Sequence, residues 1–563
     1  MLGLTVLLLA ALPAVSPEQL ETRLAADVAS VPAAAAELGR ALEGSSRGKA
    51  SDYLAALARA RCRRLARQGS WTPEDLQALL TIQLADPRRF VSEPAFRSKV
   101  LEVLPHALDP STPARLRDEL LFELDQVRGI DFAASEAIEA GWGAVPRRAL
   151  ERRVDFPKSA ADRLRFFDEA ENPLSASVYS LPSFFFSLDE AAAFLGGVRK
   201  AAPDRTLIVL TDLPLRRRLE ERSDLKLRLL ETYGRPYSPW PRDPFSLVRT
   251  PSGAVRVLVR PNLQPGREED ASLGPELIQN LPDDLDKAWG RAAWTTAPVP
   301  FHNGQVLTTR DAAWITLHAL EPRVLALLKL QRVPVETFSS KQGVGRYVTA
   351  AKKAATELET LYGRPVRFVH PLSDDPALMR RLGGGAGYDL DSIVTLLPGS
   401  RALVADVTAG RELLGRMTPE DWKAFRDGYG LEPAGEALAR SLAASQPAGL
   451  DDFLDLTAGH LAKQGMEVRR LPLLSVPVSL LRNREGLEHR EFLITWNNVV
   501  AETRDGHLRA EGFASLIPAG DRLAEDTFKA AGARLDLVPP LVRSVILNGG
   551  YRCASNHVRA AAH

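Results

Sequence analysis

The chain has 563 residues, of which 45% are hydrophobic, 25% charged and 7% aromatic. This is ordinary globular composition, and it excludes a wholly disordered, collagen-like or disulfide-dense protein. The length predicts two to four domains at roughly 150 residues each, or one large domain with an appendage. With 72 Lys and Arg against 71 Asp and Glu, the net charge is +1, so no global basic field exists to attract nucleic acid or an anionic membrane.

An apolar run, Leu2 to Ala14, opens the chain. It is too short to span a bilayer, which takes about 20 apolar residues, and it is typical of the hydrophobic part of a signal peptide, although no Lys or Arg precedes Arg23. We expect residues 1–15 to be a signal peptide and the protein to be secreted or periplasmic. The alternative is a buried first helix of a cytoplasmic protein. No later stretch reaches spanning length without a charge, so we expect a soluble protein.

Residues 16–153 form the next unit and are rich in Ala, Leu, Arg and Glu. Apolar residues recur at helical spacing, and hydroxyl residues precede first-turn prolines at Thr72 and Thr112. This pattern predicts an all-helical module of five or six helices. Its one cysteine, Cys62, lies on an arginine-rich stretch typical of a solvated helix face. With Cys553 it makes only two cysteines, which excludes a framework of several disulfides and a structural zinc site of three or four cysteines.

From residue 154 to 563, short β-branched or aromatic runs alternate with amphipathic segments, which predicts an α/β domain. A hairpin is indicated where Thr250-Pro-Ser-Gly253 joins two such runs. No strict sequence repeat is visible, although a structural one can be hidden. The expected strands are 206–210, 246–249, 255–259, 393–397, 402–405, 491–495 and 545–547, and the expected helices include 418–427 and 522–531.

Two loop clusters are candidates for binding. Ser238-Pro-Trp-Pro-Arg-Asp-Pro-Phe245 holds the carboxylate of Asp243 between prolines, where it can pair with a guanidinium through two hydrogen bonds. Phe301-His-Asn-Gly-Gln-Val-Leu-Thr-Thr309 is a polar turn that leads into a strand, and it makes His302 a candidate substrate-binding residue. Structural loops with no ligand are the alternative reading of both clusters.

A third cluster, Gly383-Gly-Gly-Ala-Gly-Tyr-Asp-Leu-Asp391, approaches an expected strand whose first residues are Asp389 and Asp391. The period of two in a strand places both carboxylates on one face, about 7 Å apart. They repel each other unless a cation lies between them, and that cation is a guanidinium, an arginine of the protein or a metal. The glycines do not fit a phosphate loop, because no Gly-Lys-Ser/Thr follows.

The fourth cluster is Leu547-Asn-Gly-Gly-Tyr-Arg-Cys-Ala-Ser-Asn556, near the end of the chain. An expected strand runs out into Gly549 and Gly550, and Cys553 follows at once. Positive neighbours such as Arg552 lower the pKa of a thiol from its usual value of about 8.5. Cys553 is therefore a candidate nucleophile, and a buried structural cysteine is the alternative.

In this order, the four clusters resemble the guanidine-modifying pentein superfamily, and above all its protein-arginine deiminases and agmatine deiminases. The resemblance covers about Asp155 to His563 and leaves the helical module outside. It implies a pentein-type α/β propeller, in which repeated ββαβ units surround a central pit, for residues 154–563.

The resemblance also implies roles for individual residues. The family's Trp-x-x-Asp loop is matched by Trp240 and Asp243, which would bind substrate. Asp391 matches the second carboxylate, which would also bind substrate, and Cys553 matches the nucleophile. One position departs from the pattern, because Asp389 stands where the family has its acid/base histidine.

A second departure is Arg552, which replaces a histidine that often precedes the nucleophile. Asp389 can serve as acid and base only if its pKa is raised. The like charge of Asp391 acts in that direction, and a bound guanidinium acts against it. For Cys553, the carboxylates raise the pKa and Arg552 lowers it, so the sequence leaves the sign open.

Two functions follow from the resemblance. The first is hydrolysis of a guanidine group, in peptidyl-arginine or in a small molecule such as agmatine, through a thiolate that adds to the guanidinium carbon. The second is a catalytically degenerate pentein pseudoenzyme that recognises arginine or serves as a structural binding protein. The missing histidine favours the second, since acid/base help contributes about 10²–10⁴-fold.

Calcium is the one cofactor that the resemblance raises, because animal protein-arginine deiminases depend on it. No loop here has the regular acidic spacing of a dedicated calcium site. The acidic runs 268–270, 283–284 and 374–375 are typical of solvated loops. We expect no required metal or other cofactor, with calcium as the alternative.

Overall fold

The computed structural model describes residues 151–157, 163–166, 170–183, 185–231, 237–260, 267–301, 303–330, 333, 335–382, 389–432, 436–444, 449–484, 487 and 489–560. The expected signal peptide (1–15) and almost all of the expected helical module (16–153) lie outside these residues, as does His302. These three expectations therefore stay predictions.

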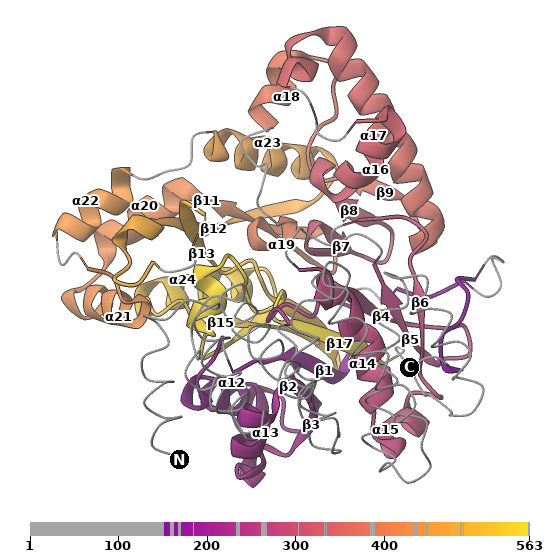
Figure 1. Ribbon diagram of the computed structural model, residues 1–563. Coiled ribbons are helices and arrows are strands. Elements are labelled where there is room, and N and C mark those ends of the chain that lie inside the picture. Colours follow the sequence, from indigo (N-terminus) through magenta and orange to yellow (C-terminus); the bar gives the residue numbers. More distant parts are fainter. Residues whose placement is uncertain are drawn as a thin grey trace, which may run out of the picture.

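Within the described residues the strands form five mixed sheets of three or four strands each (Figure 1). The first sheet contains β17 (Ser555–Arg559), β1 (Leu174–Ser180), β2 (Thr206–Thr211) and β3 (Leu227–Glu231), and the second contains β4 (Phe245–Arg249), β5 (Val255–Val259) and β6 (Ala293–Thr296). The third sheet contains β7 (Val306–Thr308), β8 (Ala313–Ile315) and β9 (Val366–Phe368), and the fourth contains β10 (Val394–Leu397), β11 (Arg401–Asp406), β12 (Glu467–Pro477) and β13 (Glu491–Thr495). The fifth sheet contains β14 (Val500–Arg504), β15 (His507–Phe513) and β16 (Arg534–Val538).

The same connectivity recurs in every sheet. An antiparallel pair is followed by a helical crossover, after which the next strand pairs in parallel. Strands β4, β5 and β6 follow this order, and so do β14, β15 and β16. In the first sheet the antiparallel partner of β1 is β17, so the end of the chain completes the first unit. A repeat that the sequence does not display is therefore present in the topology.

Helices connect the strands, within the sheets and between them, and Figure 1 shows most of them around the outside of the sheets. They are α12 (Leu188–Ala201), α13 (Leu213–Glu220), α14 (Leu273–Asn280), α15 (Asp283–Ala288), α16 (Glu321–Leu328), α17 (Lys341–Tyr362), α18 (Pro376–Leu382), α19 (Leu390–Ile393), α20 (Val407–Arg416), α21 (Pro419–Tyr429), α22 (Glu436–Ala444), α23 (Leu450–Lys463), α24 (Pro518–Ala530) and α25 (Val542–Ile546). The predicted α/β class is confirmed as a mixed α/β fold with several mixed sheets.

Aromatic packing anchors the turn that precedes β17. The ring of Tyr551 lies edge-on to Phe513, with centroids 5.6 Å apart, and to Phe194 of α12, at 6.2 Å. All three side chains are buried. Since aromatic pairs in this geometry add to the hydrophobic stabilisation, the turn that carries Cys553 is held against a rigid core.

The structure corrects two local expectations. Residues 545–547, predicted as a strand, belong mostly to helix α25. Asp389 and Asp391 do not begin a strand either: Asp389 precedes the short helix α19, and Asp391 lies in its first turn. An acidic residue in the first helical turn is favoured by the helix dipole. The strand itself starts only at Val394.

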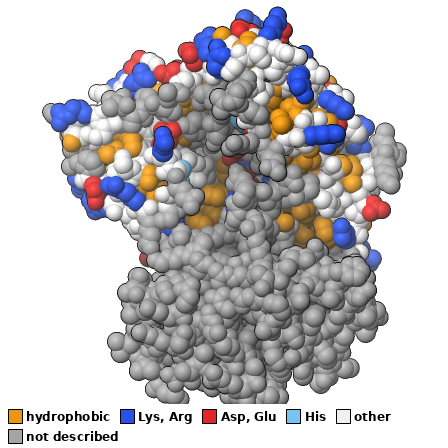
Figure 2. Space-filling view, turned by 45° about the horizontal axis from the view of Figure 1, so that its top comes forward, with side chains coloured by type: hydrophobic (Ala, Val, Ile, Leu, Met, Phe, Trp, Pro, Cys, Tyr) orange, Lys and Arg blue, Asp and Glu red, His pale blue; other side chains and the backbone are white. Residues whose placement is uncertain are grey.

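Charged side chains of both signs are interspersed with hydrophobic ones on the face shown in Figure 2. This agrees with the nearly neutral net charge of +1. In the part of the chain that the structure describes, every helix is too short or too polar to cross a bilayer.

Candidate active site

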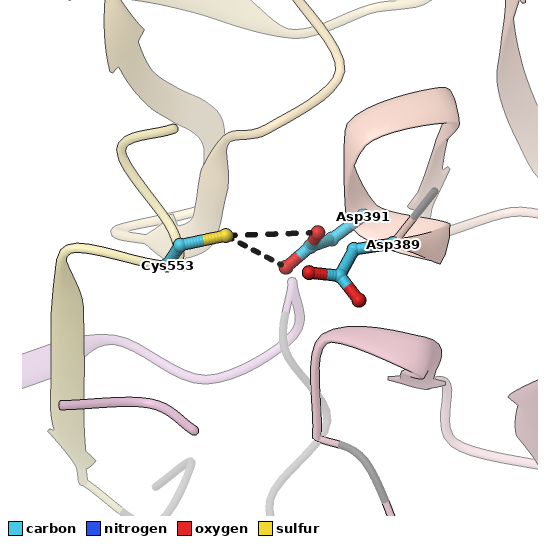
Figure 3. A group of neighbouring side chains, drawn as sticks. All are labelled: Asp389, Asp391 and Cys553. Atoms are coloured by element: carbon cyan, nitrogen blue, oxygen red, sulfur yellow. Dashed lines mark hydrogen bonds between the residues drawn. The ribbon is translucent and has the colours of Figure 1, made fainter. Parts of the chain in front are cut away.

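A cysteine and two carboxylates from distant parts of the chain meet at one place (Figure 3). Cys553 lies in the turn before β17, and Asp389 and Asp391 lie at the start of α19. The sulfur and one carboxylate oxygen from each aspartate all lie within 4.8 Å of one another. The Cys553 Sγ is 3.8 and 3.9 Å from the two Asp391 oxygens. The predicted convergence of these three residues is therefore observed, although the two aspartates lie at the start of a helix and not of a strand.

Asn498 connects the two segments. Its Nδ2 donates to the Cys553 Sγ at 3.2 Å and to Asp391 Oδ1 at 3.0 Å. Its Oδ1 accepts the main-chain N–H groups of Arg552, at 2.7 Å, and Cys553, at 3.3 Å. A single buried amide thus fixes the sulfur relative to the carboxylate. Because an N–H donor stabilises a thiolate more than a thiol, this contact lowers the pKa of Cys553.

Arg552 is buried and pairs with Asp391. Its Nη1 donates to Asp391 Oδ2 at 2.5 Å, and its Nη2 donates to the main-chain oxygen of Val306 at 2.9 Å. Together with Asn498, this arginine engages both oxygens of Asp391. The internal arginine that the sequence raised as a counter-ion is therefore the cation at Asp391.

The Trp240–Asp243 loop carries a second arginine–aspartate pair. Arg267 Nη1 donates to Asp243 Oδ2 at 2.7 Å, while its Nε donates to the buried Asp270 at 2.8 Å. The guanidinium carbon of Arg267 lies 4.8 Å from the centre of a Trp240 ring, a cation–π contact. Both residues of this loop that are expected to bind substrate thus contact an arginine of the chain itself.

Two glycines allow these parts to approach the cysteine turn. A Cβ atom on Gly549 would lie 1.8 Å from Trp240 Nε1, and one on Gly550 would lie 2.4 Å from the Asn498 Cγ. Both distances are too short for any side chain. Glycine is therefore required at these positions for close approach, which explains the Gly-Gly pair that the sequence places before Cys553.

Asp389 is partly exposed and has one fixed oxygen. Gln305 Nε2 donates to Asp389 Oδ1 at 2.9 Å, and Gln305 is itself held by Thr316. The other oxygen of Asp389, and likewise Oδ1 of Asp243, has no hydrogen-bond partner among the described residues. The site therefore presents two acceptor oxygens to a ligand, and neither belongs to Asp391.

The electrostatics of the cluster shift three pKa values upward. Burial, and then the charges of Asp391 and Asp243, raise the pKa of Asp389 to about 7. Burial also raises the pKa of Asp391, despite the opposing charge of Arg552. Burial and the three aspartates raise the pKa of Cys553 well above its usual range. The sequence left the sign for Cys553 open, and in the structure burial and the carboxylates outweigh the hydrogen bond from Asn498, so the pKa of the thiol is raised.

The same donor set bears on metal binding. Asp389, Asp391 and Cys553 are near enough to share one cation. Calcium, however, takes six to eight oxygen ligands, and both oxygens of Asp391 already accept hydrogen bonds. These three side chains alone do not supply a calcium coordination shell, and the expectation that no metal is required stays a prediction.

Sequence reasoning missed several residues that build the site. Asn498, Gln305 and Arg267 were not candidates. The adjacent amides Asn497-Asn498, directly after an expected strand, offered a signal for the first of them. Gln305 lies within the second loop cluster but was not singled out there. Arg267 offered no signal, because its role depends on partners far away in sequence.

No protein-family model matches the chain, and no curated protein matches it significantly. Solved structures give distant likenesses. One is the agmatine deiminase of Enterococcus faecalis, with 11% identity, a TM-score of 0.43, and coverage of 72% of this chain and 98% of that one. Another, a structural-genomics target assigned as an agmatine deiminase, also has 11% identity and a TM-score of 0.43, covering 73% and 99%.

A third likeness is a Porphyromonas gingivalis protein assigned as an arginine deiminase, with 14% identity, a TM-score of 0.39, and coverage of 70% of this chain and 98% of that one. Likenesses with TM-scores below 0.5 do not by themselves establish the fold family or the activity of this chain. The functional argument therefore rests on the site.

Proposed function

We propose that the chain is a guanidine-modifying hydrolase that converts an arginine side chain to a ureido group and ammonia. The observation that carries this proposal is the convergence of the Cys553 sulfur with the carboxylates of Asp389 and Asp391 within 4.8 Å. The sulfur is a nucleophile, and the carboxylates select a cation. The order of the motifs, which resembles the pentein deiminases, supports peptidyl-arginine as the substrate, with a small guanidine as the alternative.

The unengaged oxygens of Asp243 and Asp389 are the groups that we assign to the incoming guanidinium. Two carboxylates on opposite sides of a planar cation fix its orientation through paired hydrogen bonds. Asp391 has a different role in this proposal from the one the sequence suggested. It holds Arg552 and, through Asn498, the cysteine turn.

Asp389 is also the group that we assign to proton transfer. A carboxyl group with a pKa of about 7 exchanges protons readily at neutral pH. It first takes the Cys553 thiol proton, and the thiolate then bonds to the guanidinium carbon. The protonated Asp389 gives this proton to the departing nitrogen as the carbon–nitrogen bond breaks, and ammonia leaves.

The remaining thiouronium cation is hydrolysed in the second half of the reaction. Asp389 takes a proton from water as the water oxygen bonds to the carbon. The carbon–sulfur bond then breaks, the hydroxyl proton goes to solvent, and a ureido product leaves. The proton on Asp389 returns to the thiolate, which restores the starting state.

Substrate itself supports thiolate formation in this scheme. In the free protein, burial and then the charges of three carboxylates raise the pKa of the Cys553 thiol. A guanidinium bound between Asp243 and Asp389 adds a positive charge beside the sulfur and lowers its pKa. Cys553 is therefore activated when substrate is present and stays unreactive otherwise.

We also propose that the five ββαβ units form the pentein-type propeller that the motif order implies. The recurring connectivity of the sheets supports this, as does the pairing of β17 with β1. In this arrangement the turn before β17, the start of α19 and the Trp240–Asp243 loop belong to different units. Their convergence is what a site at the centre of such units requires.

Incubation of the purified full-length protein with an arginine-containing peptide and with agmatine tests the activity. Ureido product is measured between pH 5 and 9, with and without calcium. We expect product from the wild type, loss of product in Cys553→Ala, and no change in Asp526→Asn, which alters an exposed carboxylate on α24. Absence of product under all conditions would overturn the proposal.

A second candidate function, recognition of arginine without turnover, is favoured by one observation. Arg552 and Asn498 engage both oxygens of Asp391, so the carboxylate that the family pattern assigns to substrate is occupied. Calorimetry with the same peptide separates the two functions. Binding that survives Cys553→Ala, without product from the wild type, would establish recognition alone.

A further inference from the structure

Arg260 follows β5 directly, and only 2% of its surface is exposed. Its guanidinium group donates to two main-chain oxygens, from Nη2 to that of Arg242 at 3.1 Å and from Nη1 to that of Phe301 at 3.2 Å. These oxygens belong to the first two loop clusters of the sequence, residues 238–245 and 301–309. One buried side chain therefore joins the two loops, and no step of the proposed reaction uses it.

In the first loop, Arg260 contacts the backbone on both sides of Asp243. Its side chain donates to the main-chain oxygen of Arg242, which precedes Asp243. Its own main-chain N–H donates to the oxygen of Pro244, which follows Asp243, at 3.0 Å. With the backbone held on both flanks, the carboxylate cannot move independently of the end of β5. Arg260 thus determines where Asp243 lies.

The second loop leads to Asp389. Phe301 lies three residues before Gly304, where a Cβ atom would lie 2.8 Å from the Asp389 Cγ. The next residue, Gln305, donates to Asp389 Oδ1. The guanidinium carbon of Arg260 also lies 5.7 Å from the centre of the Phe301 ring, a cation–π contact. The loop that Arg260 holds through Phe301 is therefore the loop against which Asp389 packs.

The contacts of Arg260 differ from those of Arg267, the other arginine beside Asp243. At Arg267, the bonded carboxylates of Asp270 and Asp243 outweigh burial, and the pKa is raised. Within the described part of the chain, the Arg260 side chain donates only to main-chain oxygens. Burial lowers its pKa to about 10, against the opposing charges of Asp243 and then Asp389. Arg260 thus acts on both carboxylates through charge while leaving their oxygens open to substrate.

We infer that Arg260 is a positioning residue that fixes the spacing of the Asp243 and Asp389 carboxylates, so that one guanidinium group can bind to both. This inference rests on the proposed function, which assigns these two carboxylates to substrate. Arginine suits the role because its planar group presents donors in fixed directions and can reach two oxygens at once. Lysine keeps the charge, but its compact ammonium group lacks this fixed arrangement.

Replacement of Arg260 should weaken substrate binding more than the chemical step. Gln305 still holds Asp389, and Asn498 still holds Cys553, whereas the loop of the other substrate carboxylate is released. In full-length Arg260→Gln, we expect the KM for agmatine or an arginine peptide to rise about tenfold or more, the equivalent of one charged hydrogen bond. The kcat should stay within about threefold, which is the pattern of lost binding.

Arg249→Gln is the matched control. Arg249 lies in β4, is half-buried and also donates to two main-chain oxygens, those of Arg559 and Gly253, but it joins neither loop to the other. Its replacement should lower the free energy of unfolding and leave KM unchanged. A merely structural role of Arg260 predicts this same result for Arg260→Gln, and that result would overturn the inference.

Arg260→Lys separates the charge from the bridge between the loops. Its KM should lie between those of the wild type and Arg260→Gln, and a wild-type KM would overturn the bridging role. If Arg260→Gln does not fold, Arg260→Lys decides alone, since a raised KM at nearly constant kcat is expected only if the bridge matters.

Calorimetry with agmatine and the arginine peptide in the Cys553→Ala background separates this inference from the proposed function. We expect Arg260→Gln to raise the Kd about tenfold there as well. Binding or turnover that Arg260→Gln leaves unchanged would overturn this inference alone. Absence of turnover in the wild type, together with absence of binding in Cys553→Ala, would overturn the proposed function and this inference with it.

Discussion

Arg205 and Arg552 are both buried arginines that pair with carboxylates, yet the pKa values of those carboxyl groups shift in opposite directions. Arg205 donates to both oxygens of Glu511, at 2.6 and 2.7 Å, and to Glu502 at 2.9 Å. Burial raises the pKa of Glu511, but the charge and hydrogen bonds of Arg205 outweigh burial, so the pKa is lowered overall. At Asp391, burial instead outweighs Arg552, and the pKa of the carboxyl group is raised.

The difference lies in what else faces each carboxylate. Glu511 also accepts a hydrogen bond from the hydroxyl of Tyr551 at 2.7 Å. Hydrogen-bond donors from both Arg205 and Tyr551 therefore stabilise its ionised form. Asp391 instead faces the like charge of Asp243 and lies beside Asp389 and a thiol. The first arrangement is a structural ion cluster, and the second places several raised pKa values in one site, which is typical of functional sites.

The largest expected effect is on activity, at Cys553 in the cluster around Asp391, where a substitution should change the reaction rate but not the stability of the fold. Cys553→Ala should reduce guanidine hydrolysis by about 10⁴-fold or more, because no other group can form the covalent intermediate. Its free energy of unfolding should change little, since the sulfur makes few contacts that a methyl group loses. Product assays and urea unfolding of the same preparation check both parts. Retained turnover would remove Cys553 from the mechanism.

The reverse pattern is expected in the first cluster. Arg205→Met leaves Glu511 buried without its paired arginine, and Glu502 with Arg504 alone, so unfolding should become easier by about 3–5 kcal/mol. Pairing it with Glu511→Leu should recover part of this loss, since an apolar pair removes the unpaired charge. Urea unfolding of the single and double variants is the measurement. A loss below about 1 kcal/mol for the single variant would mean that the cluster is not structural.

Asp389→Asn should affect both activity and stability. At low pH both the Asp389 carboxyl group and the Cys553 thiol carry a proton. In the proposed mechanism the reactive form of the protein carries only one of these two protons. Activity of the wild type should therefore rise with pH through about 7. The variant should lose this rise, together with about 10²-fold of rate or more. A pH profile of kcat/KM for the two proteins tests this, and an unchanged profile would contradict the assignment of Asp389.

The same substitution should stabilise the fold at high pH. The folded-state pKa of Asp389 is raised to about 7. The contribution of the protonated carboxyl group to the free energy of unfolding is therefore complete below the pKa of the unfolded chain, and it is lost as the pH rises through 7. At pH 8 the ionised wild type carries the full penalty. The Asp389→Asn variant has a neutral amide there and avoids it, so it should be more stable by on the order of 1–2 kcal/mol at pH 8 and equal to the wild type at pH 4. Stabilisation at both pH values would contradict this cause.

The sequence predicted local structure best where the residues that determine it are close together in the chain. The turn from Thr250 to Gly253 joins β4 and β5 as expected, and Gly253 has the positive φ, 89°, that such a turn requires. Residues 545–547 are β-branched in part and were predicted as a strand, but they lie mostly in α25. Ser544 of that helix accepts from Trp240 Nε1 at 3.0 Å, across 304 residues. No local pattern reports such a contact.

For the site, the sequence predicted the identity of the groups better than their roles. Cys553, Asp389 and Asp391 do meet, because the motif order carries that information. The pairing of Asp391 with Arg552 was open in the sequence, since the state of a buried carboxylate depends on everything around it. Arg267 beside Asp243 was missed for the same reason.

Tyr551→Phe gives the smallest expected effect and tests whether the two clusters are connected. The Tyr551 hydroxyl donates to Glu511 and contacts the hydroxyl of Tyr179, and Cys553 follows two residues later. Burial raises the pKa of Tyr551, so it remains a donor at every pH of interest. Glu511 keeps Arg205 in the variant, and the loss of one hydrogen bond should therefore cost about 1 kcal/mol of unfolding free energy.

The ring packing that places the cysteine turn is unchanged, so kcat should stay within about threefold, since only a displacement of the reacting groups lowers it strongly. A much larger loss of kcat at this small cost in stability would mean that the ion cluster positions Cys553 through this hydroxyl, and that the two regions act as one.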